Sequence, residues 1–200
     1  MFKKILLIYH SIINYFNLIW YILQFSFMVE NDLKIVYISS NILNEVEEKI
    51  TFDDKTFSKH RDRLHLQESG KGLYLIAFLN KFPVGHVFIR WEGAEDSYVK
   101  THIKNCPNIE DLFVNPKFRS LGIGSKLIDK CIKLAKEKGF FQIGLGVEVT
   151  NIKAAGLYSR FNFEEANINP YKDIWFGEDK KGSKAGPFSA IVKYFILGFH

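Results

Sequence analysis

Residues 108–124 read NIEDLFVNPKFRSLGIG and predict a strand, a turn and the start of a helix. Apolar residues dominate the first half, Pro116 ends the apolar run, and an amphipathic segment follows the glycines. Gly122 and Gly124 are expected at the helix start, where no Cβ atom blocks a ligand and the first N–H groups lack acceptors within the helix. Several amides can therefore point at one anion, so the stretch predicts a phosphate-binding turn.

The residues around these glycines exclude two common phosphate-binding signatures. The dinucleotide fingerprint requires a third glycine that is absent here, and the P-loop requires Gly-Lys-Ser or Gly-Lys-Thr where residues 124–126 read GSK. Instead, RSLGIG at residues 119–124 follows a strand that ends in VNP at residues 114–116. This pattern resembles the acyl-CoA pyrophosphate loop of the GNAT superfamily of N-acetyltransferases.

A second group of residues extends the resemblance downstream. The residues that resemble the second GNAT signature, at matching spacing, are Leu145, Val147, Asn151, Ala154, Leu157, Tyr158 and Phe163. Asn162 stands where the family usually has glycine, and asparagine tolerates the left-handed backbone that such a position requires. Two linked motifs favour an acetyltransferase over an ordinary strand-to-helix turn, and the resemblance covers about residues 28–166.

The resemblance implies a mixed α/β fold with a central, mostly antiparallel sheet and helices on both faces. Two central parallel strands are expected to splay apart, so that the pantetheine arm of acetyl-CoA fills the gap between them. A single N-acetyltransferase domain is expected over residues 29–200, with a last strand in the tail, residues 167–200. The residue pattern predicts strands at 33–38, 72–79, 84–91, 109–114, 141–149 and 161–164, and helices at 42–50, 52–66, 123–138 and 151–160.

The implied activity is transfer of the acetyl group of acetyl-CoA, a co-substrate, to a primary amine. Direct attack is expected rather than an acetyl-enzyme, since neither Cys106 nor Cys131 falls on a motif. Cys131 matches the apolar face of its helix and is expected in the core. Two alternatives stay open, an enzyme that uses a longer acyl-CoA and a GNAT-like CoA-binding regulatory module without turnover.

The resemblance also assigns roles to single residues. Tyr158 is expected to give a proton to the leaving thiolate, and Asn151 to contact the pantetheine arm. The remaining residues expected to bind acetyl-CoA are Leu112, Phe113, Val114, Arg119, Ser120, Leu121, Gly122, Ile123, Gly124 and Ser125. A backbone N–H near residues 112–114 is expected to stabilise the oxyanion. Without the resemblance, Tyr158 reads as an aromatic residue that covers the sheet and Asn151 as a helix cap.

A base must take a proton before the amine attacks, because only the neutral amine is nucleophilic. Glu110 and Asp111 are the first candidates, since their strand runs beside the thioester. As neighbours in a strand they are expected to point to opposite faces, so that only one reaches the site. Glu148 on the neighbouring strand and a water molecule are the alternatives. The histidines show no metal-binding spacing, and no metal site is expected.

The segments expected to wall the acceptor side are acidic, with interleaved aromatic residues. Their members are Glu45, Glu47, Glu48, Asp53, Asp54, Trp91, Glu92, Glu95, Asp96 and Tyr98. Such groups attract cations, which predicts a small amine acceptor that is polycationic, like a polyamine or an aminoglycoside. The alternative is an ordinary solvated surface, because Arg61, Arg63 and Lys100 lie among the acids.

The composition fits one globular domain. With 200 residues, 47% of them hydrophobic, the chain can bury a sizeable core. Its net charge of +5 is scattered without a block of like charges, so nucleic acid is not an expected partner. Two cysteines without metal or redox spacing fit a reducing cytoplasm. A homodimer stays open.

Residues 1–28 form an apolar extension ahead of that domain. From residue 5 to residue 29, 19 of 25 side chains are apolar and none is charged. A segment of this length and composition is long enough to span a bilayer. No small-residue cleavage site is present, so a secretory signal peptide is not expected. Three interpretations stay open: a membrane anchor through residues 5–29, an amphipathic helix packed on the domain, and non-native sequence upstream of a start at Met28.

Overall fold

The computed structural model describes residues 32–50, 59–178 and 184–199. The chain divides into two units, Met1–Asp32 and Leu33–His200, and every element named below belongs to the second unit. The apolar extension predicted at residues 1–28 lies outside the described residues, as do Asp53 and Asp54 of the predicted acidic wall. Among the helices that are described, none has the length and apolar character needed to cross a membrane.

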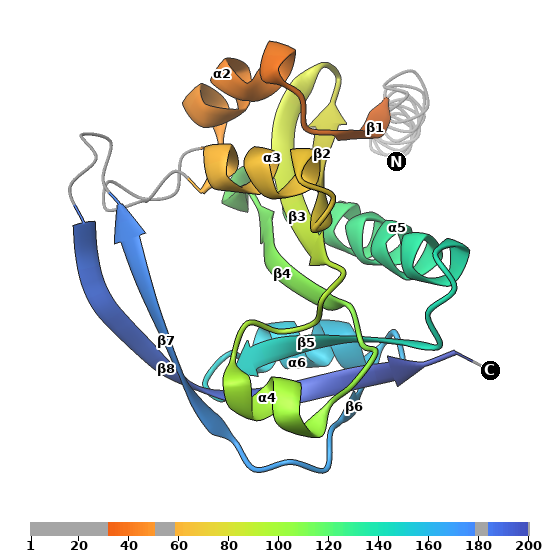
Figure 1. Cartoon of the computed structure of the whole chain (residues 1–200). Coiled ribbons are helices and arrows are strands. Elements are labelled where there is room, and N and C mark those ends of the chain that lie inside the picture. Colours follow the sequence, from red (N-terminus) through yellow and green to blue (C-terminus); the bar gives the residue numbers. More distant parts are fainter. Residues whose placement is uncertain (1–31, 51–58, 179–183, 200) are drawn as a thin grey trace, which may run out of the picture. The chain divides into compact units, whose positions relative to one another are not determined.

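The described residues of the second unit form one eight-stranded sheet with helices on both faces (Figure 1). The strands are β1 (Leu33–Tyr37), β2 (Gly72–Leu79), β3 (Phe82–Arg90), β4 (Asn108–Val114), β5 (Gln142–Glu148), β6 (Glu164–Glu165), β7 (Tyr171–Glu178) and β8 (Lys184–Gly198). The helices are α2 (Ser40–Lys49), α3 (His60–Glu68), α4 (Ser97–His102), α5 (Ile123–Glu137) and α6 (Ile152–Ser159), with a 3₁₀ turn, η1, at Pro116–Phe118. The predicted mixed α/β fold is confirmed.

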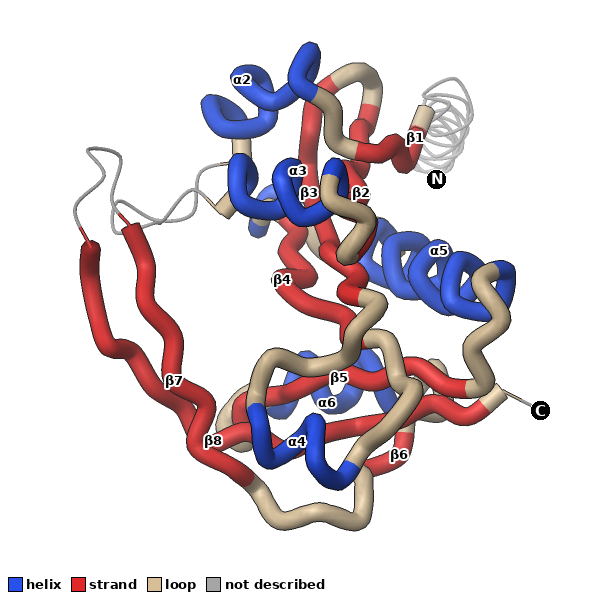
Figure 2. The backbone as a smooth tube through the Cα atoms, viewed as in Figure 1, coloured by secondary structure: helices blue, strands red, loops and turns tan. Residues whose placement is uncertain are grey.

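The strand order is β1-β2-β3-β4-β5-β8-β6, and β7 pairs with β8 outside that path. Within the described sheet, neighbouring strands are antiparallel except β4 and β5, which run parallel. These two strands pair through Asn108 with Gly144 and through Ile109 with Leu145, and then diverge (Figure 2). The resemblance predicted this splay, which separates the C-terminal parts of β4 and β5.

The two faces of β2 carry different parts of the core. Tyr74 and Ile76 point to the face covered by α2 and α3, where they pack with Leu64. Leu75 and Ala77 point to the opposite face, which α5 covers. Because side chains alternate along a strand, burial on both faces requires the near-continuous apolar run that the sequence shows.

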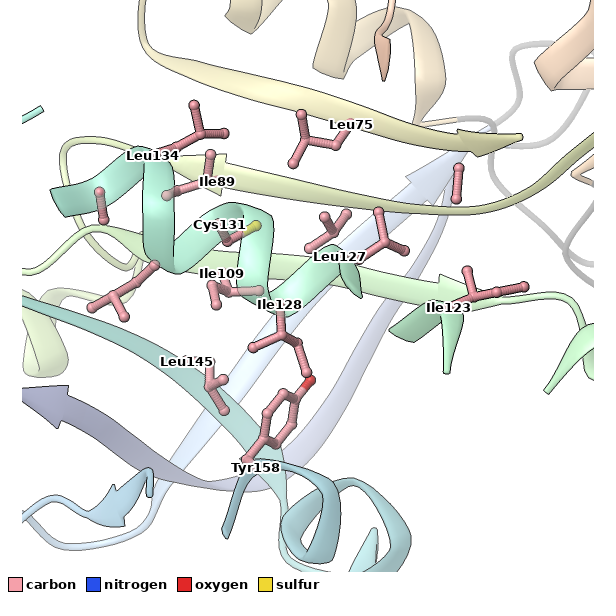
Figure 3. Packing of buried hydrophobic residues seen from close by; sticks show 14 of the residues in the cluster. Leu75, Ile89, Ile109, Ile123, Leu127, Ile128, Cys131, Leu134, Leu145 and Tyr158 are labelled. Atoms are coloured by element: carbon pink, nitrogen blue, oxygen red, sulfur yellow. The ribbon is translucent and has the colours of Figure 1, made fainter. Parts of the chain in front are cut away.

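Helix α5 buries one stripe of side chains against the sheet, as its periodicity predicts (Figure 3). The buried members are Ile123, Leu127, Ile128, Cys131, Leu134 and Ala135. Cys131 is fully buried in this stripe, which confirms its expected place in the core. The helix ends at Glu137, two residues before Gly139, whose φ of 86° lies in the left-handed region that favours glycine.

Several element bounds differ from the sequence-based prediction. The predicted loop at residues 92–107 contains α4. The sequence did not predict this helix, because six residues are too few to show a helical period. The hairpin turn before β3 consists of Asn80 and Lys81 alone, with φ of 50° and 71°, so β3 begins earlier than predicted. The helix predicted at residues 52–66 is described only from His60, and β6 is confined to Glu164–Glu165.

The tail contains a long hairpin where a single last strand was predicted. β7 and β8 pair from Tyr171 with Val192 to Glu178 with Lys184, and β8 continues along β5 and β6. The glycine- and lysine-rich stretch at residues 177–187 reads as a loop in the sequence and concealed the pairing. In Figure 1 this hairpin extends away from the rest of the sheet, and it contributes one wall of the site described next.

Candidate active site

A cavity of about 730 Å³ opens where β4 and β5 diverge. Residues of β4, β5, α3, α6, the β7–β8 hairpin and the segments before α3 and α4 line it. The predicted site residues that the cavity brings together are Glu110, Asp111, Leu112, Glu148, Asn151 and Tyr158. The predicted phosphate turn, residues 119–125, lies between η1 and the start of α5, beside α6: a Cβ atom on Gly124 would lie 3.9 Å from Leu157 Cδ2.

The predicted phosphate turn has the backbone that its glycines suggest. Gly122 precedes α5 with φ of 76°, a conformation that glycine adopts without strain. The first helical hydrogen bond joins Lys126 N–H to Gly122 C=O, so the amides of residues 123–125 have no acceptor within the helix. A Cβ atom on Gly124 would make ordinary van der Waals contacts at 3.8 Å or more. The turn therefore fits a bound phosphate group.

The residues just before Gly122 hold the turn in place. Arg119 Nε donates a hydrogen bond to the Val114 carbonyl at 3.0 Å, which keeps its exposed guanidinium beside the turn. Ser120 has φ of 64°, and Leu121 is exposed. The positive charge of Arg119 next to the free helix amides adds to the attraction for an anion.

Strand β4 contains a bulge at the point where it leaves β5. Asp111 has φ of 52°, and Val87 of β3 lies opposite both Asp111 and Leu112. The expectation that Glu110 and Asp111 point to opposite faces is therefore wrong, because the bulge interrupts the alternation of side chains. Both carboxylates contact Arg63 Nη2, Glu110 at 3.0 Å and Asp111 at 2.5 Å, and both line the cavity.

These two carboxylates belong to a chain of ion pairs. Asp111 also pairs with Lys59 at 3.2 Å, and Glu110 pairs with Arg90 at 2.8 Å. Burial opposes ionisation of Asp111, but the charges of Arg63 and Lys59 outweigh burial and lower the pKa of its carboxyl to about 2. A carboxylate held in this way is ionised at neutral pH and is a weak base.

Tyr158 lies between the core and the cavity. Its side chain is 7% exposed, its ring centroid lies 5.9 Å from that of Phe163, and its hydroxyl points towards Ile128 of α5 (Figure 3). Burial, with a smaller contribution from Cys131, raises the pKa of Tyr158, so the hydroxyl stays protonated at neutral pH. The residue thus combines a packing contact with a protonated hydroxyl, and it lines the cavity.

Asn151 and Glu148 also line the cavity but have local partners. The Asn151 side chain caps α6 by accepting a hydrogen bond from Ala154 N–H at 3.1 Å. Glu148 accepts a hydrogen bond from the Thr150 hydroxyl at 2.8 Å. Asn151 therefore has the capping role that its position alone suggested, at a place that also borders the gap between β4 and β5.

The predicted acidic wall reaches the cavity in part. Glu95 and Asp96 line it, and Asp96 also caps α4. The other described members of that set lie elsewhere in the unit: Glu45, Glu47, Glu48, Trp91, Glu92 and Tyr98. Trp91, for example, stacks on Phe140 with ring centroids 6.1 Å apart.

Sequence reasoning missed the contribution of β7. Five consecutive residues of this strand line the cavity: Tyr171, Lys172, Asp173, Ile174 and Trp175. A Cβ atom on Gly146 would lie 2.9 Å from the Tyr171 hydroxyl oxygen. The reading GLG at residues 144–146, inside an otherwise apolar strand, was the available signal, because glycine in a strand often marks the close approach of another group.

Comparison with known proteins identifies the family. The family model described as the Acetyltransferase (GNAT) family matches residues 40–163, which is more than half of the chain and includes both motifs. The chain belongs to the GNAT family of acetyltransferases. The predicted superfamily is confirmed, and acetyl-CoA is the co-substrate of this family.

Relatives of this GNAT protein include N-acetyltransferases of archaea and vertebrates. An uncharacterized N-acetyltransferase of Methanocaldococcus jannaschii is 43% identical over 48% of this chain and 40% of its own length. An N-alpha-acetyltransferase of Sulfolobus acidocaldarius is 31% identical over 52% of this chain and 62% of its own. N-alpha-acetyltransferase 50 of Danio rerio is 29% identical over 66% of this chain and 72% of its own length. The match thus spans less than two thirds of the first two relatives.

Solved structures share the fold. An N-acetyltransferase from Staphylococcus aureus has a TM-score of 0.59 at 16% identity and covers 84% of this chain and 98% of its own. A Salmonella typhimurium protein, whose structure includes its cofactor acetyl-CoA, has a TM-score of 0.58 at 17% identity and covers 85% and 95%. These likenesses confirm the GNAT fold and carry no information about the acceptor.

Proposed function

We propose that this GNAT enzyme transfers the acetyl group of acetyl-CoA to a primary amine by direct attack. The observation that carries the proposal is the position of Tyr158 at a cavity between two diverging strands, one residue from Leu157, which borders the phosphate turn. Residues 119–125 would hold the pyrophosphate, and Asn151 with the separated edges of β4 and β5 would hold the pantetheine arm. When bound, acetyl-CoA supplies the activated acetyl group.

The state of both cysteines supports direct attack over an acetyl-enzyme. Burial raises the pKa of the Cys106 thiol to about 12, and burial raises that of Cys131 as well. Neither cysteine is among the described residues that line the cavity. Because the thiolate and not the thiol is the nucleophile, neither residue is suited to carry the acetyl group.

Two groups of the chain are proposed to serve the chemical step. Tyr158 keeps its proton at neutral pH and would give it to the CoA sulfur as the C–S bond breaks. Leu112 lies in the bulge of β4 and lines the cavity, so its backbone N–H is the proposed donor to the oxyanion. Both contributions act mainly in the transition state rather than in binding.

The charge of the cavity supports a cationic acceptor. Among the described lining residues, six carboxylates face three basic side chains. The acids are Glu95, Asp96, Glu110, Asp111, Glu148 and Asp173, and the bases are Lys59, Arg63 and Lys172. Trp175 adds an aromatic ring at the same wall, which can attract a cation. We therefore propose a small polycationic amine, such as a polyamine or an aminoglycoside, as the acceptor.

A protein N-terminal α-amine is the second candidate acceptor. Two of the relatives described above are N-alpha-acetyltransferases, and one of them matches over 66% of this chain. An α-ammonium group is also a cation, so the acidic cavity does not exclude it.

A thiol-release assay with acetyl-CoA separates these proposals. The panel is spermidine, neomycin, a tetrapeptide with a free N-terminus and an N-terminally acetylated lysine peptide. We expect the highest kcat/KM for spermidine or neomycin, with rates that fall as ionic strength rises. A higher kcat/KM for the tetrapeptide contradicts the polycationic acceptor and favours the second candidate. Tight binding of acetyl-CoA without thiol release for any amine contradicts transfer and favours a CoA-binding module.

A further inference from the structure

We propose that Asp173 of β7 is the general base of this acetyltransferase. The assignment rests on the proposed transfer to an amine and adds the group that receives the amine's proton. Three observations support it: the face of β7 on which Asp173 lies, the partners of the other carboxylates at the cavity, and the groups that face Asp173.

The hairpin places Asp173 at the cavity, which residues of both faces of β7 line. Tyr171 and Asp173 lie on one face of β7, since side chains alternate along a strand. Their partners on β8 are Val192 and Ala190, and all four residues line the cavity. The Tyr171 hydroxyl reaches Gly146, where β5 has already separated from β4. Asp173 is the next residue on that face and lies opposite Ala190.

Three of the other carboxylates that line the cavity are ion-paired, and the remaining two each accept a local hydrogen bond. The pairs are Glu95 with Arg90, Glu110 with Arg63 and Arg90, Asp111 with Arg63 and Lys59, Asp96 with the Val99 amide, and Glu148 with the Thr150 hydroxyl. In the part of the chain that the structure describes, Asp173 has no ion pair, and it accepts a hydrogen bond from the backbone amide of Ile174. A carboxylate that is already neutralised by arginine gains little from a proton, whereas Asp173 is available to accept one.

The groups that face Asp173 make its carboxylate more basic. Burial and the negative charge of Asp96 raise the pKa of Asp173 above its ordinary value, and Glu110 of β4 adds to the effect. The Ile174 amide on the same strand and Lys59 ahead of α3 oppose it without reversing it. A base is most effective when its pKa approaches the working pH, so this environment suits Asp173 for general-base catalysis.

The proton balance of the step is complete with the groups at the cavity. Asp173 accepts one proton from the acceptor ammonium, which frees the nitrogen lone pair to form the C–N bond. Tyr158 gives its proton to the sulfur as the C–S bond breaks, and the second proton of the nitrogen returns to Tyr158 through solvent. Asp173 then releases its proton to solvent, so each amide formed yields one free CoA thiol and one proton.

The test is the pH dependence of kcat/KM for Asp173→Asn, with spermidine and with the tetrapeptide as acceptors. At neutral pH the variant should lose about 100-fold in kcat/KM, because the amine must lose its proton unaided. The deficit should shrink as the pH rises towards about 10, the range in which a primary amine is itself neutral. Calorimetry should show unchanged binding of acetyl-CoA.

Two further variants separate a base from a structural residue. Asp96→Asn keeps a capping side chain at α4 but removes the charge that raises the pKa of Asp173, so the acid limb of the profile should move to lower pH. Glu165→Gln removes an acid that pairs with Lys193 outside the cavity and should leave the profile unchanged. Carbon-13 NMR of labelled aspartate in the full chain should find one carboxyl that titrates above the rest and disappears in Asp173→Asn.

The outcomes are distinguishable. A wild-type enzyme that releases thiol, combined with an Asp173→Asn variant of unchanged pH profile, overturns the assignment of the base and leaves the proposed function standing. An NMR pKa for Asp173 at or below the ordinary value also overturns it. A wild-type chain that releases no thiol with any amine overturns the proposed function itself.

Discussion

The hydroxyl oxygen of Tyr171 lies 2.9 Å from the position that a Cβ atom on Gly146 would occupy. Cβ atoms do not approach other atoms so closely, so β7 reaches β5 at this point because residue 146 is glycine. Val192 of β8 would lie equally close, at 2.9 Å. One missing side chain on β5 therefore determines where the hairpin wall of the cavity stands.

Gly146→Ala should displace that wall without unfolding the chain. The new methyl group pushes against Tyr171 and Val192, which moves Asp173 relative to the gap between β4 and β5. We expect kcat/KM to fall by up to about 100-fold, as misplacement by one ångström can cause, with acetyl-CoA affinity retained. The matched control is Gly156→Ala on α6, where a Cβ atom would meet nothing within 4 Å. Normal kinetics for Gly146→Ala would show that the hairpin position does not matter.

Gly124→Val should abolish acetyl-CoA binding while the fold survives. A side chain at this position projects over the turn whose free amides are proposed to hold the pyrophosphate. Contacts within the protein do not oppose it, since the Cβ atom would find its neighbours at 3.8 Å or more. Gly122 is less suitable for the test, because a β-branched residue at φ of 76° adds backbone strain of about 1–2 kcal/mol. If calorimetry finds unchanged affinity of Gly124→Val for acetyl-CoA, and the melting temperature is also unchanged, the turn at residues 119–125 does not bind the pyrophosphate.

Tyr158→Phe should lower turnover and leave binding intact. Phenylalanine keeps the contact with Phe163 but cannot donate a proton to the leaving thiolate. We expect kcat to fall by about 100-fold and the dissociation constant of acetyl-CoA to stay within twofold, as for a group that acts in the transition state. If Tyr158→Phe turns over as fast as wild type at every pH, Tyr158 has a packing role and does not donate the proton.

The pairing of Asp111 with Arg63 and Lys59 should make stability depend on pH in the acid range. The folded chain lowers the pKa of Asp111 from 3.8 to about 2, so its contribution is fully present above pH 4 or so and is lost as the pH falls through about 2. The difference corresponds to roughly 2 kcal/mol of unfolding free energy.

Asp111→Asn tests this linkage. The variant should unfold more easily at neutral pH, by about 3 kcal/mol, because Arg63 loses one buried partner. Its unfolding free energy should also change less than that of wild type between about pH 4 and pH 2. Glu48→Gln, which removes an exposed pair with Lys49, is the control and should follow wild type. Parallel urea titrations of the three proteins across this range measure both effects, and identical slopes would contradict the linkage.

Local patterns in the sequence were sufficient to predict the elements whose structure depends on residues close together in the chain. The apolar stripe of α5 follows a 3.6-residue period, and β2 and β3 are apolar on both faces, so their type and burial were predictable. The turn before α5 was predictable for the same reason, since two glycines and a helix start are adjacent in the chain. Asn162, with φ of 61°, adopts the left-handed backbone that its place in the motif predicted.

The part of the candidate site that was not predictable depends on contacts between distant residues. The bulge at Asp111 exists because one residue of β3 faces two residues of β4, and neither strand alone carries that register. Arg63 then brings two acids of β4 to one side, although their spacing had indicated opposite faces.

The wall of the cavity formed by the β7–β8 hairpin likewise depends on tertiary structure that the sequence alone did not predict. By itself, the sequence determined the strand, the glycine turn predicted to bind phosphate, the buried helix and the presence of Tyr158 downstream, because each is encoded by residues within a few positions of one another. Only the tertiary structure decided that Tyr171 rests on Gly146 and that Asp173 lines the same cavity as Glu110 and Asp96. Those relationships come from the register of β7 on β8 and of β8 on β5, which long-range pairing sets and which no local period in the chain encodes.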